Sequence, residues 1–533
     1  MTTTKQSDDH EPTTPTPPLP PTPPTPRLAR PTLASIVATL GPSSSDPAMI
    51  RRLIIAGVSI FRFNFSHGTV DEHAARLRLV RQTAASLGVP IAVLGDLQGP
   101  KIRIGLVPDP GITLNIGEDV LIDPAVQEAR PGQPPTTPVT PAPPLPPMLG
   151  CSVQTLATDV KPGHKVLIND GAIRLLAVER HPTDSPSALR CRVIVGGLVT
   201  SKKGINTPQS DLSLSALTDR DIDWVKWSVT NSLDFLALSF VRTAAEVRTL
   251  RDLTRSLAGA AGPIPIVAKI ETPRAIDNMD EIVRESDAIM VARGDLGVEM
   301  DLALVPILQK RLIRCAASWG KPAIVATQML ETMISSAIPT RAEASDVANA
   351  VLDGADAVML SGETAAGKHP ALVVETMRRI VCIAENEQSS RPEAATPPTN
   401  LSLVRHPTAA LAHAAWYAVR DTAAKAIACW SQNGGTARYL SQTGTPVPIV
   451  AYSSSEQQTR RMTLLKGVTS VFIPPPASLA EWTHQVEADL LARGIAAAGD
   501  KLVLLAGMPV GAAFATNRLA LHTMGDPKGG FLL

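Results

Sequence analysis

The chain has few cysteines, and no two of them form a closely spaced pair. Its five cysteines are scattered over 533 residues without a CxxC pattern. This spacing argues against a disulfide framework or a zinc site. It favours core thiols in a protein of a reducing compartment.

An excess of charge of one sign is also lacking. Fifty basic residues stand against 49 acidic residues, so the formal net charge is +1. Because no global field favours nucleic acid or an anionic membrane, neither is an expected partner, and any affinity for phosphate has to be local. The sequence contains no apolar run of about 18 residues and no charged-then-apolar leader. We therefore expect a cytoplasmic protein.

Proline is frequent, with 48 residues, but it is concentrated in two tracts. Ten prolines lie within residues 1–31, and nine lie within residues 131–147. The first tract predicts a disordered Thr/Pro-rich tail, and the second predicts a loop insertion. Either tract could be a PxxP ligand for a partner module, but a plain tether is the simpler interpretation.

Eight short apolar runs, each bounded by polar or glycine turns, recur along the chain. They cover residues 35–42, 57–68, 90–101, 233–241, 265–271, 287–295, 321–329 and 356–364. Most gaps between them hold an amphipathic helical stretch, such as 71–88 or 304–320. Thr340 and Glu343 have the spacing of a capping box and are interpreted as structural. These units predict an α/β fold, a closed parallel (β/α)8 TIM barrel with its active site at the carboxyl ends of the strands.

Two further regions do not fit the barrel. About 130 residues separate the third run from the fourth, too many for a structureless loop, and their short strand-like segments predict an inserted small β-barrel lid domain. From about residue 400 onward, strands and helices alternate again, which predicts an open α/β domain. The predicted domains are the barrel at 32–103 and 216–390, the lid with its proline-rich insertion at 104–215, and the C-terminal domain at 400–533.

Polar side chains stand at the predicted carboxyl ends of the strands. They include Arg62, Asn64, Ser66, Asp96, Arg103, Lys269, Glu271, Arg293, Gly294, Asp295, Thr327, Ser361 and Glu363. Residues two apart in a strand face the same way, so Lys269 and Glu271 can project together. Asp295 reaches the same space if its run is the neighbouring parallel strand. Two carboxylates beside one lysine suit a phosphate and Mg²⁺, so the centre of the chain predicts a catalytic site.

Several motifs together resemble those of the pyruvate kinase family. They are FRFNFSHG, GDLQGPKIR, SKKGIN, AKIE, MVARGDLGVE, ATQMLE and SDVANAVLDGADAVMLSGETAAGKHP, spread in this order over roughly residues 33–530. The resemblance implies a phosphotransferase that moves the phosphoryl group of phosphoenolpyruvate to ADP, giving pyruvate and ATP in the final step of glycolysis. It also implies a mobile lid, a C-terminal domain for an allosteric effector and for oligomerisation, and a homotetramer.

The resemblance implies a function for each residue at the centre of the site. Glu271 and Asp295 would bind Mg²⁺ or Mn²⁺, and the backbone amides of Gly294 and Asp295 would bind the substrate carboxylate. Lys269 would lie against the transferring phosphoryl group, and Arg62 would bind that group from the other side. The alternative for Lys269 is a plain ion pair with Glu271.

The resemblance also implies residues for the nucleotide and for the proton. Asn64, Arg103 and Lys203 would bind the nucleotide phosphates, although the SKKG lysines could instead form a solvated turn. The hydroxyl of Thr327, or a water that it binds, would protonate the enolate carbon. Ser361 and Glu363 could relay this proton or simply cap the next helix.

One stretch departs from potassium-dependent relatives, which carry a sequence like DTKGPEIR where this chain has DLQGPKIR. The candidate K⁺ pocket consists of Asn64, Ser66, Asp96 and the Leu97 carbonyl. Lys101 replaces the family's glutamate, and its ammonium could supply the charge that K⁺ would otherwise bring. We therefore expect K⁺ not to be required.

A turn in the C-terminal domain differs as well. Relatives that are activated by fructose 1,6-bisphosphate often have SGRS, where this chain has NGGT. The missing arginine removes a bidentate phosphate anchor, so another phosphorylated effector, or none, remains open. The candidate effector residues are Ser431, Asn433, Gly434 and Thr436.

Two other interpretations of the barrel remain open. Mg²⁺-dependent lyases or aldolases of pyruvate-like enolates also place Glu and Asp at strand ends, but they would not need the lid, Arg103, Lys203 or Lys269. Borohydride trapping with pyruvate would reveal a Schiff base on a barrel lysine. A catalytically silent regulatory paralogue would have lost Lys269 or a metal carboxylate, and none of these is lost.

Overall fold

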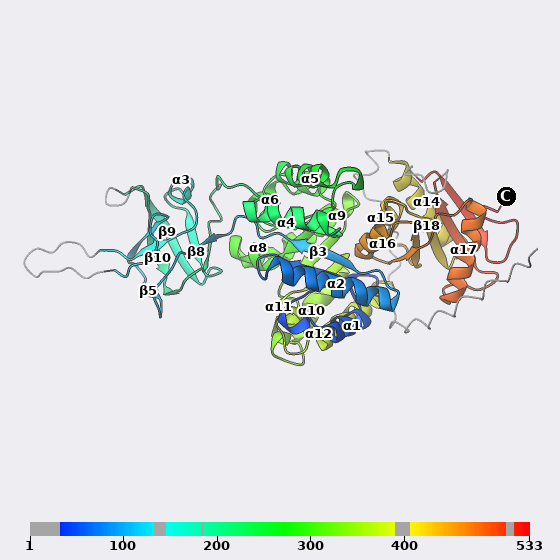
Figure 1. Ribbon diagram of the computed structural model, residues 1–533, viewed down its shortest axis with the longest axis horizontal. Helices are drawn as coiled ribbons and strands as arrows, with labels where there is room; N and C mark the ends of the chain where they lie inside the picture. Colours follow the sequence, from blue (N-terminus) through cyan, green and yellow to red (C-terminus); the bar gives the residue numbers. More distant parts are fainter. Residues whose placement is uncertain (1–31, 133–144, 183–185, 390–405, 508–515, 533) are drawn as a thin grey trace, which may run out of the picture.

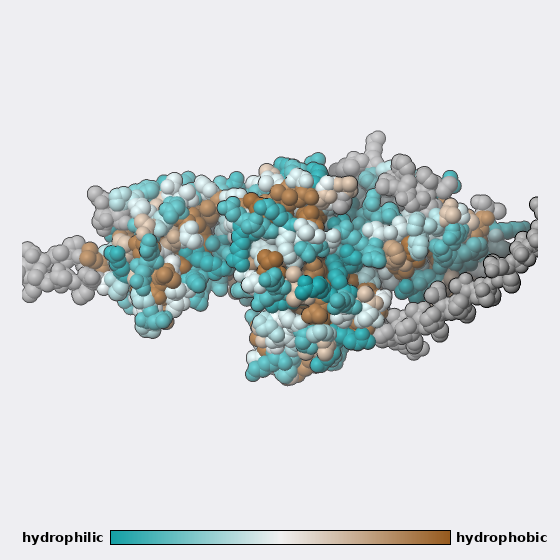
Figure 2. Space-filling model, viewed as in Figure 1, coloured by the Kyte–Doolittle hydropathy of each residue, from teal (hydrophilic) through white to brown (hydrophobic). Residues whose placement is uncertain are grey.

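The computed structural model describes residues 32–132, 145–182, 186–389, 406–507 and 516–532. The predicted tail and most of the predicted proline-rich insertion lie outside these residues. The described chain forms three bodies in a row along the long axis of Figure 1. Figure 2 shows a largely hydrophilic face with separate apolar patches. None of the described helices is long and apolar enough to span a membrane.

The central body is the predicted parallel barrel. Its strands are β1 (Ser35–Thr39), β2 (Val58–Asn64), β3 (Ala92–Asp96), β13 (Phe235–Leu238), β14 (Ile266–Ile270), β15 (Ala288–Ala292), β16 (Ala323–Ala326) and β17 (Ala357–Leu360). They close in the order β1-β17-β16-β15-β14-β13-β3-β2, which confirms the eight strands expected from the apolar runs. Because helices cover the outside and side chains fill the inside, nearly every strand residue is buried.

Helices connect the barrel strands and surround them (Figure 1). They are α1 (Pro47–Ala56), α2 (Val70–Leu87), α4 (Asp219–Thr230), α5 (Ala244–Ala258), α6 (Pro273–Asp277), α7 (Met279–Glu285), α8 (Arg293–Glu299), α9 (Val305–Ser318), α10 (Arg341–Leu352), α11 (Gly362–Ala365) and α12 (Pro370–Ser389), with short 3-10 turns η1 (Pro42–Ser44), η2 (Gly259–Ala261), η3 (Leu302–Leu304) and η4 (Glu331–Ile334). The predicted capping box is confirmed, because Thr340 Oγ1 accepts a hydrogen bond from Glu343 N at 3.2 Å and the Glu343 carboxylate accepts one from Thr340 N at 2.8 Å.

The inserted body consists of short strands and one helical turn. They are β4 (Ile102–Arg103), β5 (Ile112–Leu114), β6 (Asp119–Asp123), β7 (Met148–Gly150), α3 (Leu156–Asp159), β8 (Lys165–Ile168), β9 (Ile173–Arg180), β10 (Leu189–Val195), β11 (Gly197–Val199) and β12 (Gly204–Asn206). Seven strands form the sheet β4-β12-β8-β9-β10-β6-β7, and β11 pairs with β5. A bridge between Ile104 and Cys151 joins the two ends of the larger sheet. The insertion is therefore a small β-barrel, which we call the lid.

The third body is an open α/β domain. Its elements are α14 (Pro407–Thr422), β18 (Ala426–Trp430), α15 (Gly435–Ser441), β19 (Ile449–Ser453), α16 (Glu456–Arg461), η5 (Met462–Leu464), β20 (Val468–Phe472), α17 (Leu479–Ala492), β21 (Lys501–Ala506) and β22 (Arg518–Thr523). The sheet order is β20-β19-β18-β21-β22, with β22 antiparallel at one edge. This arrangement agrees with the predicted open α/β fold.

The C-terminal domain packs on the amino-terminal ends of the barrel strands. Ser35, at the start of β1, donates a hydrogen bond to the Thr463 carbonyl at 2.5 Å. Asp356, next to the start of β17, accepts one from Gln442 Nε2 at 2.7 Å. Leu464 is buried in the same apolar cluster as the barrel interior. The lid and the C-terminal domain thus occupy opposite ends of the barrel (Figure 1).

Asp234 is the main charged group in this interface. Its completely buried carboxylate accepts hydrogen bonds from Val93 N at 2.8 Å, Arg81 Nη2 at 2.8 Å and Arg460 Nε at 2.9 Å. We expect Asp234→Ala to lower the free energy of unfolding by about 3–5 kcal/mol, because two largely buried guanidinium groups lose their counter-charge. Urea denaturation measures this effect.

The matched control for Asp234 is Asp223, which is 75% exposed and pairs with Lys226 at 3.0 Å. We expect Asp223→Ala to cost less than about 1 kcal/mol, as is usual for surface ion pairs. Equal losses from the two substitutions would contradict the structural importance of Asp234.

Candidate active site

Lys269 lies at the centre of a buried cluster of charges at the carboxyl ends of β3 and β14. Its Nζ is 2.8 Å from Glu271 Oε1 and 3.5 Å from Asp96 Oδ1, and it donates a hydrogen bond to Ser239 Oγ at 2.7 Å. Burial alone would lower the pKa of Lys269, but the charges of Asp96, Glu271 and Asp295 raise it above its ordinary value. The ammonium is therefore charged at any ordinary assay pH.

Arg62 brings a second positive charge to the same cluster from β2. Its Nε donates to Asp96 Oδ2 at 2.7 Å, and its Nη1 donates to Thr39 Oγ1 at 3.1 Å. Burial alone would raise the pKa of Asp96, but Lys269 and Arg62 outweigh it and hold that pKa below its usual value. Asp96 therefore joins the two cations while it remains ionised.

Glu271 is completely buried at the end of β14. Its Oε2 accepts a hydrogen bond from Phe240 N at 2.7 Å. Burial raises the pKa of Glu271, Lys269 opposes that increase, and Asp295 adds to it. Glu271 Oε1 has the ion-pair contact with Lys269 but no hydrogen bond of good geometry.

The two carboxylates predicted to bind a metal fit Mg²⁺. Mg²⁺ commonly uses one or two carboxylates and takes its remaining ligands from substrate phosphate oxygens and water. The described residues contain no group of three or more His, Cys, Asp or Glu side chains suited to a metal. The buried Glu271 Oε1, which lacks a hydrogen bond, is an oxygen that a cation could satisfy. Glu271 and Asp295 would therefore hold the ion together with substrate.

Thr327 follows β16 in a strained conformation, with φ of 68°. Its Oγ1 accepts a hydrogen bond from Gly294 N at 2.7 Å and donates to the Ala326 carbonyl at 2.6 Å. Arg293 Nη2 donates a hydrogen bond to the Thr327 carbonyl at 2.8 Å, which helps to hold the loop in place. The hydroxyl is thereby fixed at the start of α8, one residue from Asp295.

Glu363 supports the same loop. Its buried carboxylate accepts hydrogen bonds from Leu330 N at 3.1 Å and from Ser361 N at 2.7 Å. Both oxygens are therefore engaged by backbone amides. These contacts favour the structural alternative for Glu363 over a proton relay.

The sequence interpretation missed three contributors to this site. Ser239 donates to the Leu97 carbonyl at 2.8 Å and also accepts the Lys269 hydrogen bond. Phe240 supplies an amide to Glu271, and Thr39 accepts from Arg62. Ser239 and Thr39 stand at carboxyl ends of barrel strands, and that position was the available signal.

The candidate nucleotide residues of the lid lie on one short ladder. Arg103 of β4 pairs with Gly204 of β12, which follows Lys203. The Arg103 guanidinium donates to the Lys202 carbonyl at 3.1 Å. Within the described residues, no hydrogen bond or ion pair joins the Arg103 or Lys203 side chain to the Lys269 cluster. Arg103 and Lys203 thus lie on adjoining segments of the lid, where Ile104 N donates to the Lys203 carbonyl at 2.8 Å.

Two oxygens of the candidate K⁺ pocket already accept hydrogen bonds. Asn64 Oδ1 accepts from Ser66 N at 3.1 Å, and Leu97 offers its carbonyl to Ser239. Lys101 Cε lies close to β12 of the lid, where a Cβ at Gly204 would be 3.1 Å from it.

Side chains in and beside the candidate effector turn form hydrogen bonds that hold it. Ser431 Oγ accepts a hydrogen bond from Ala437 N at 3.2 Å, and the Thr436 and Thr516 hydroxyls are 2.5 Å apart. Gly434 has φ of 75°, and a Cβ there would meet Gln458 Nε2 at 2.2 Å. Asn433 is exposed.

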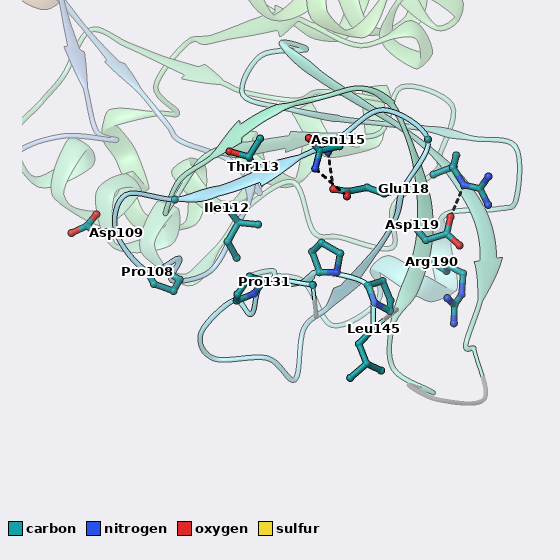
Figure 3. Close-up of a pocket in the computed structure, with 16 residues that line it drawn as sticks. Pro108, Asp109, Ile112, Thr113, Asn115, Glu118, Asp119, Pro131, Leu145 and Arg190 are labelled. Atoms are coloured by element: carbon teal, nitrogen blue, oxygen red, sulfur yellow. Dashed lines mark hydrogen bonds and ion pairs between the residues drawn. The ribbon is translucent and has the colours of Figure 1, made fainter. Parts of the chain in front are cut away.

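A cavity of about 840 Å³ opens on the lid and not at the barrel strand ends. Figure 3 shows its lining, which includes Asp109, Ile112, Pro131 and Leu145, and the contact between Asn115 and Glu118. None of the predicted catalytic residues lines it.

The (β/α)8 barrel gathers two cations and several carboxylates at its strand ends, and a lid with further basic residues lies beside them. This combination is typical of barrel enzymes that transfer phosphoryl groups. Residues 32–374 match the family model of the pyruvate kinase barrel domain, and residues 409–522 match that of the pyruvate kinase alpha/beta domain. The chain therefore belongs to the pyruvate kinase family, whose members are phosphotransferases acting on phosphoenolpyruvate and ADP.

Individual relatives agree with this assignment. The pyruvate kinase of Agrobacterium vitis is 40% identical over 494 residues, which cover 92% of this chain and 98% of the relative. That of Mycobacterium tuberculosis H37Rv is 38% identical over 496 residues, with the same two coverages of 92% and 98%. The crystal structure of a pyruvate kinase from Cryptosporidium parvum superposes with a TM-score of 0.82 at 30% identity, covering 92% of this chain and 96% of that one. The lyase, aldolase and silent-paralogue interpretations are not supported.

Proposed function

We propose that Lys269, Arg62, Glu271 and Asp295 carry out phosphoryl transfer from phosphoenolpyruvate to ADP with Mg²⁺. The observation that carries this assignment is the buried ammonium of Lys269, 2.8 Å from Glu271 and 3.5 Å from Asp96. ATP formation from phosphoenolpyruvate and ADP by the purified protein and by its Lys269 variant tests the assignment.

Charge neutralisation explains why these residue types are needed. Phosphoryl transfer depends on positioning and on stabilising the charge of the transferring group. Lys269 and Arg62 supply fixed positive charges that Asp96 orients. A Mg²⁺ ion held by Glu271 and Asp295 would supply further positive charge to the substrate oxygens. The amide of Asp295, and that of Gly294 once it releases Thr327 Oγ1, would bind the substrate carboxylate.

Thr327 is our candidate for delivering the proton to the enolate carbon. Its hydroxyl is held by Gly294 N and by the Ala326 carbonyl, so its position is fixed before substrate binds. Ser361 and Glu363 would act by holding the Thr327 loop.

For the nucleotide, we propose Asn64 on the barrel and Arg103 and Lys203 on the lid. Arg103 lies on β4, and Lys203 directly precedes β12, the strand that pairs with β4, which supports a shared contribution to nucleotide phosphates.

We propose that this enzyme works without K⁺, because Lys101 stands where relatives have glutamate. Replacing tetramethylammonium chloride by KCl at equal ionic strength is expected to raise kcat less than about twofold. In the Lys101→Glu variant, K⁺ is expected to raise kcat by about tenfold or more. The new carboxylate would restore the need for a cation at the candidate K⁺ pocket of Asn64, Ser66, Asp96 and Leu97. A coupled assay for pyruvate measures both effects. Strong activation of the unmodified enzyme by K⁺ would contradict the proposal.

We propose a homotetramer with two different interfaces. The described residues expose one apolar patch on the barrel, formed by Leu302, Leu304 and Ile307, and a further apolar side chain, Leu521, on the β22 edge strand of the C-terminal sheet. A tetramer of two-fold symmetries needs two such self-complementary surfaces. Sedimentation equilibrium should therefore give four chains for the unmodified protein and two for Ile307→Glu. A monomer in the unmodified protein would contradict this proposal.

The turn that carries Ser431, Asn433, Gly434 and Thr436 is our candidate site for a phosphorylated effector. An increase in kcat/KM for phosphoenolpyruvate on adding a sugar phosphate or a nucleoside monophosphate would support it. A cytoplasmic location stays a proposal that cell fractionation tests.

A further inference from the structure

The lid touches the barrel helix that carries the proposed metal ligand Asp295. Asn206, the last residue of β12, donates a hydrogen bond from Nδ2 to Glu299 Oε1 at 2.7 Å. Glu299 is the last residue of α8, and Asn206 is only 8% exposed. This contact joins the lid to the same short helix that begins at Arg293.

A second contact lies beside the first. Gly171, in the turn between β8 and β9, comes close enough to α8 that a Cβ there would be 3.9 Å from Val298 Cγ1. Asn169 N in the same turn donates to the Gly204 carbonyl at 3.0 Å, which ties the turn to β12. The lid thus rests on the last turn of α8 through two neighbouring segments.

Glu299 occupies an unfavourable place for a carboxylate. It stands at the carboxyl end of a helix, where the backbone dipole favours cations. It also lies four residues after Asp295, so the two carboxylates share one face of α8. Among the described residues, the Asn206 amide is the hydrogen-bond donor that Glu299 has. Burial raises the pKa of Glu299 to about 7, and the Asn206 hydrogen bond opposes that rise, so the bond stabilises the carboxylate form.

The two segments that connect the lid to the barrel are fixed at the barrel rim. Asp221 Oδ1 accepts a hydrogen bond from Gln98 N at 3.0 Å on the first segment. Arg242 donates to the carbonyls of Leu212 at 2.5 Å and Leu214 at 2.6 Å on the second. Between these anchor points, Asn206 and Gly171 bring the lid against α8.

We propose that Asn206 and Glu299 are positioning residues for the nucleotide. Their hydrogen bond fixes β12 against α8 and so places Lys203 and Arg103 relative to Asp295. This inference rests on the proposed function, in which the lid cations bind ADP and the barrel alone binds phosphoenolpyruvate. Loss of this hydrogen bond should therefore raise KM for ADP far more than KM for phosphoenolpyruvate.

The test compares Asn206→Ala, Glu299→Ala, Glu299→Gln and the double variant Asn206→Ala/Glu299→Ala with the unmodified enzyme. Loss of this hydrogen bond is expected to raise KM for ADP by about tenfold in each alanine variant. KM for phosphoenolpyruvate should change less than about twofold. Glu299→Gln keeps a carbonyl acceptor and should restore most of the ADP affinity. The double variant should be no worse than either single variant, because both remove one interaction.

Hydrogen exchange adds a readout that separates positioning from general damage. Amides of residues 165–173 and 202–206 should exchange faster in the alanine variants, while those of the barrel strands stay unchanged. The control is Asn115→Ala, which removes another Asn–Glu contact of the lid, at 3.3 Å between Asn115 Nδ2 and Glu118 Oε2 (Figure 3). It should leave both KM values unchanged.

Three outcomes would overturn the inference: additive losses in the double variant, equal changes in the two KM values, or no recovery with Glu299→Gln. Each outcome is compared with the unmodified enzyme, which must first be shown to make ATP. If the unmodified enzyme makes no ATP, the proposed function fails first, so the two failures are distinguishable.

Discussion

Replacing Lys269 by methionine is expected to lower kcat for ATP formation by about 1,000-fold or more. Methionine keeps the length of the side chain but removes the ammonium, which lies within 3.5 Å of both Asp96 and Glu271. Fixed positive charges that stabilise a transferring phosphoryl group are worth about 10³ to 10⁵ in rate. Because the neighbouring carboxylates keep the Lys269 pKa above its ordinary value, raising the pH to 9 should not reproduce the loss in the unmodified enzyme.

Lys226→Met is the matched control for this substitution. Lys226 is 56% exposed and pairs only with Asp223 among the described residues, at 3.0 Å. Its kcat should stay within about twofold of the unmodified value. Circular dichroism and thermal denaturation show whether the Lys269 variant is folded. A folded variant with more than about a tenth of the normal kcat would contradict the proposed contribution of Lys269.

Glu271→Gln is expected to have the second large effect, a fall in kcat of about 1,000-fold together with the loss of activation by Mg²⁺. Glutamine keeps an oxygen that accepts from Phe240 N, so the backbone contact survives. The variant loses the charge that would hold the metal, and a catalytic metal contributes several kcal/mol of transition-state stabilisation. Titration of activity with Mg²⁺ and with Mn²⁺ measures the change.

Glu179→Gln provides the comparison, because Glu179 is 51% exposed in a lid ion pair with Arg190. It should leave the Mg²⁺ titration unchanged. A Glu271→Gln enzyme that reaches normal kcat at saturating Mg²⁺ would show that the metal is held elsewhere.

Much of the fold could be predicted because a parallel barrel buries both faces of its strands. Such strands are continuous apolar runs, and the chain separates them with amphipathic helices. The lid was harder to predict. Its strands are short, and the bridge that joins its sheet ends pairs Ile104 with Cys151, whose neighbourhood in sequence gives no sign of the pairing.

The active-site cluster was predictable within β14 and toward its expected neighbour, the run that ends in Asp295. The two-residue repeat of a strand predicted that Lys269 and Glu271 face the same way. The distance of 2.8 Å between Lys269 Nζ and Glu271 Oε1 agrees with this prediction. The contacts of Lys269 with Asp96 and Ser239 come from other strands of the closed barrel, so they depend on strand order and register rather than on local pattern. The positive φ of Thr327 is likewise imposed by tertiary contacts.

ATP formation from phosphoenolpyruvate and ADP with Mg²⁺, measured side by side for the unmodified enzyme and Lys269→Met, is the most direct test of the proposed chemistry. We expect ready turnover by the unmodified enzyme without K⁺ and a loss of about 1,000-fold in the folded variant. Absence of ATP with the unmodified enzyme, or undiminished turnover in the variant, would contradict the assignment of the Lys269 cluster as the active site.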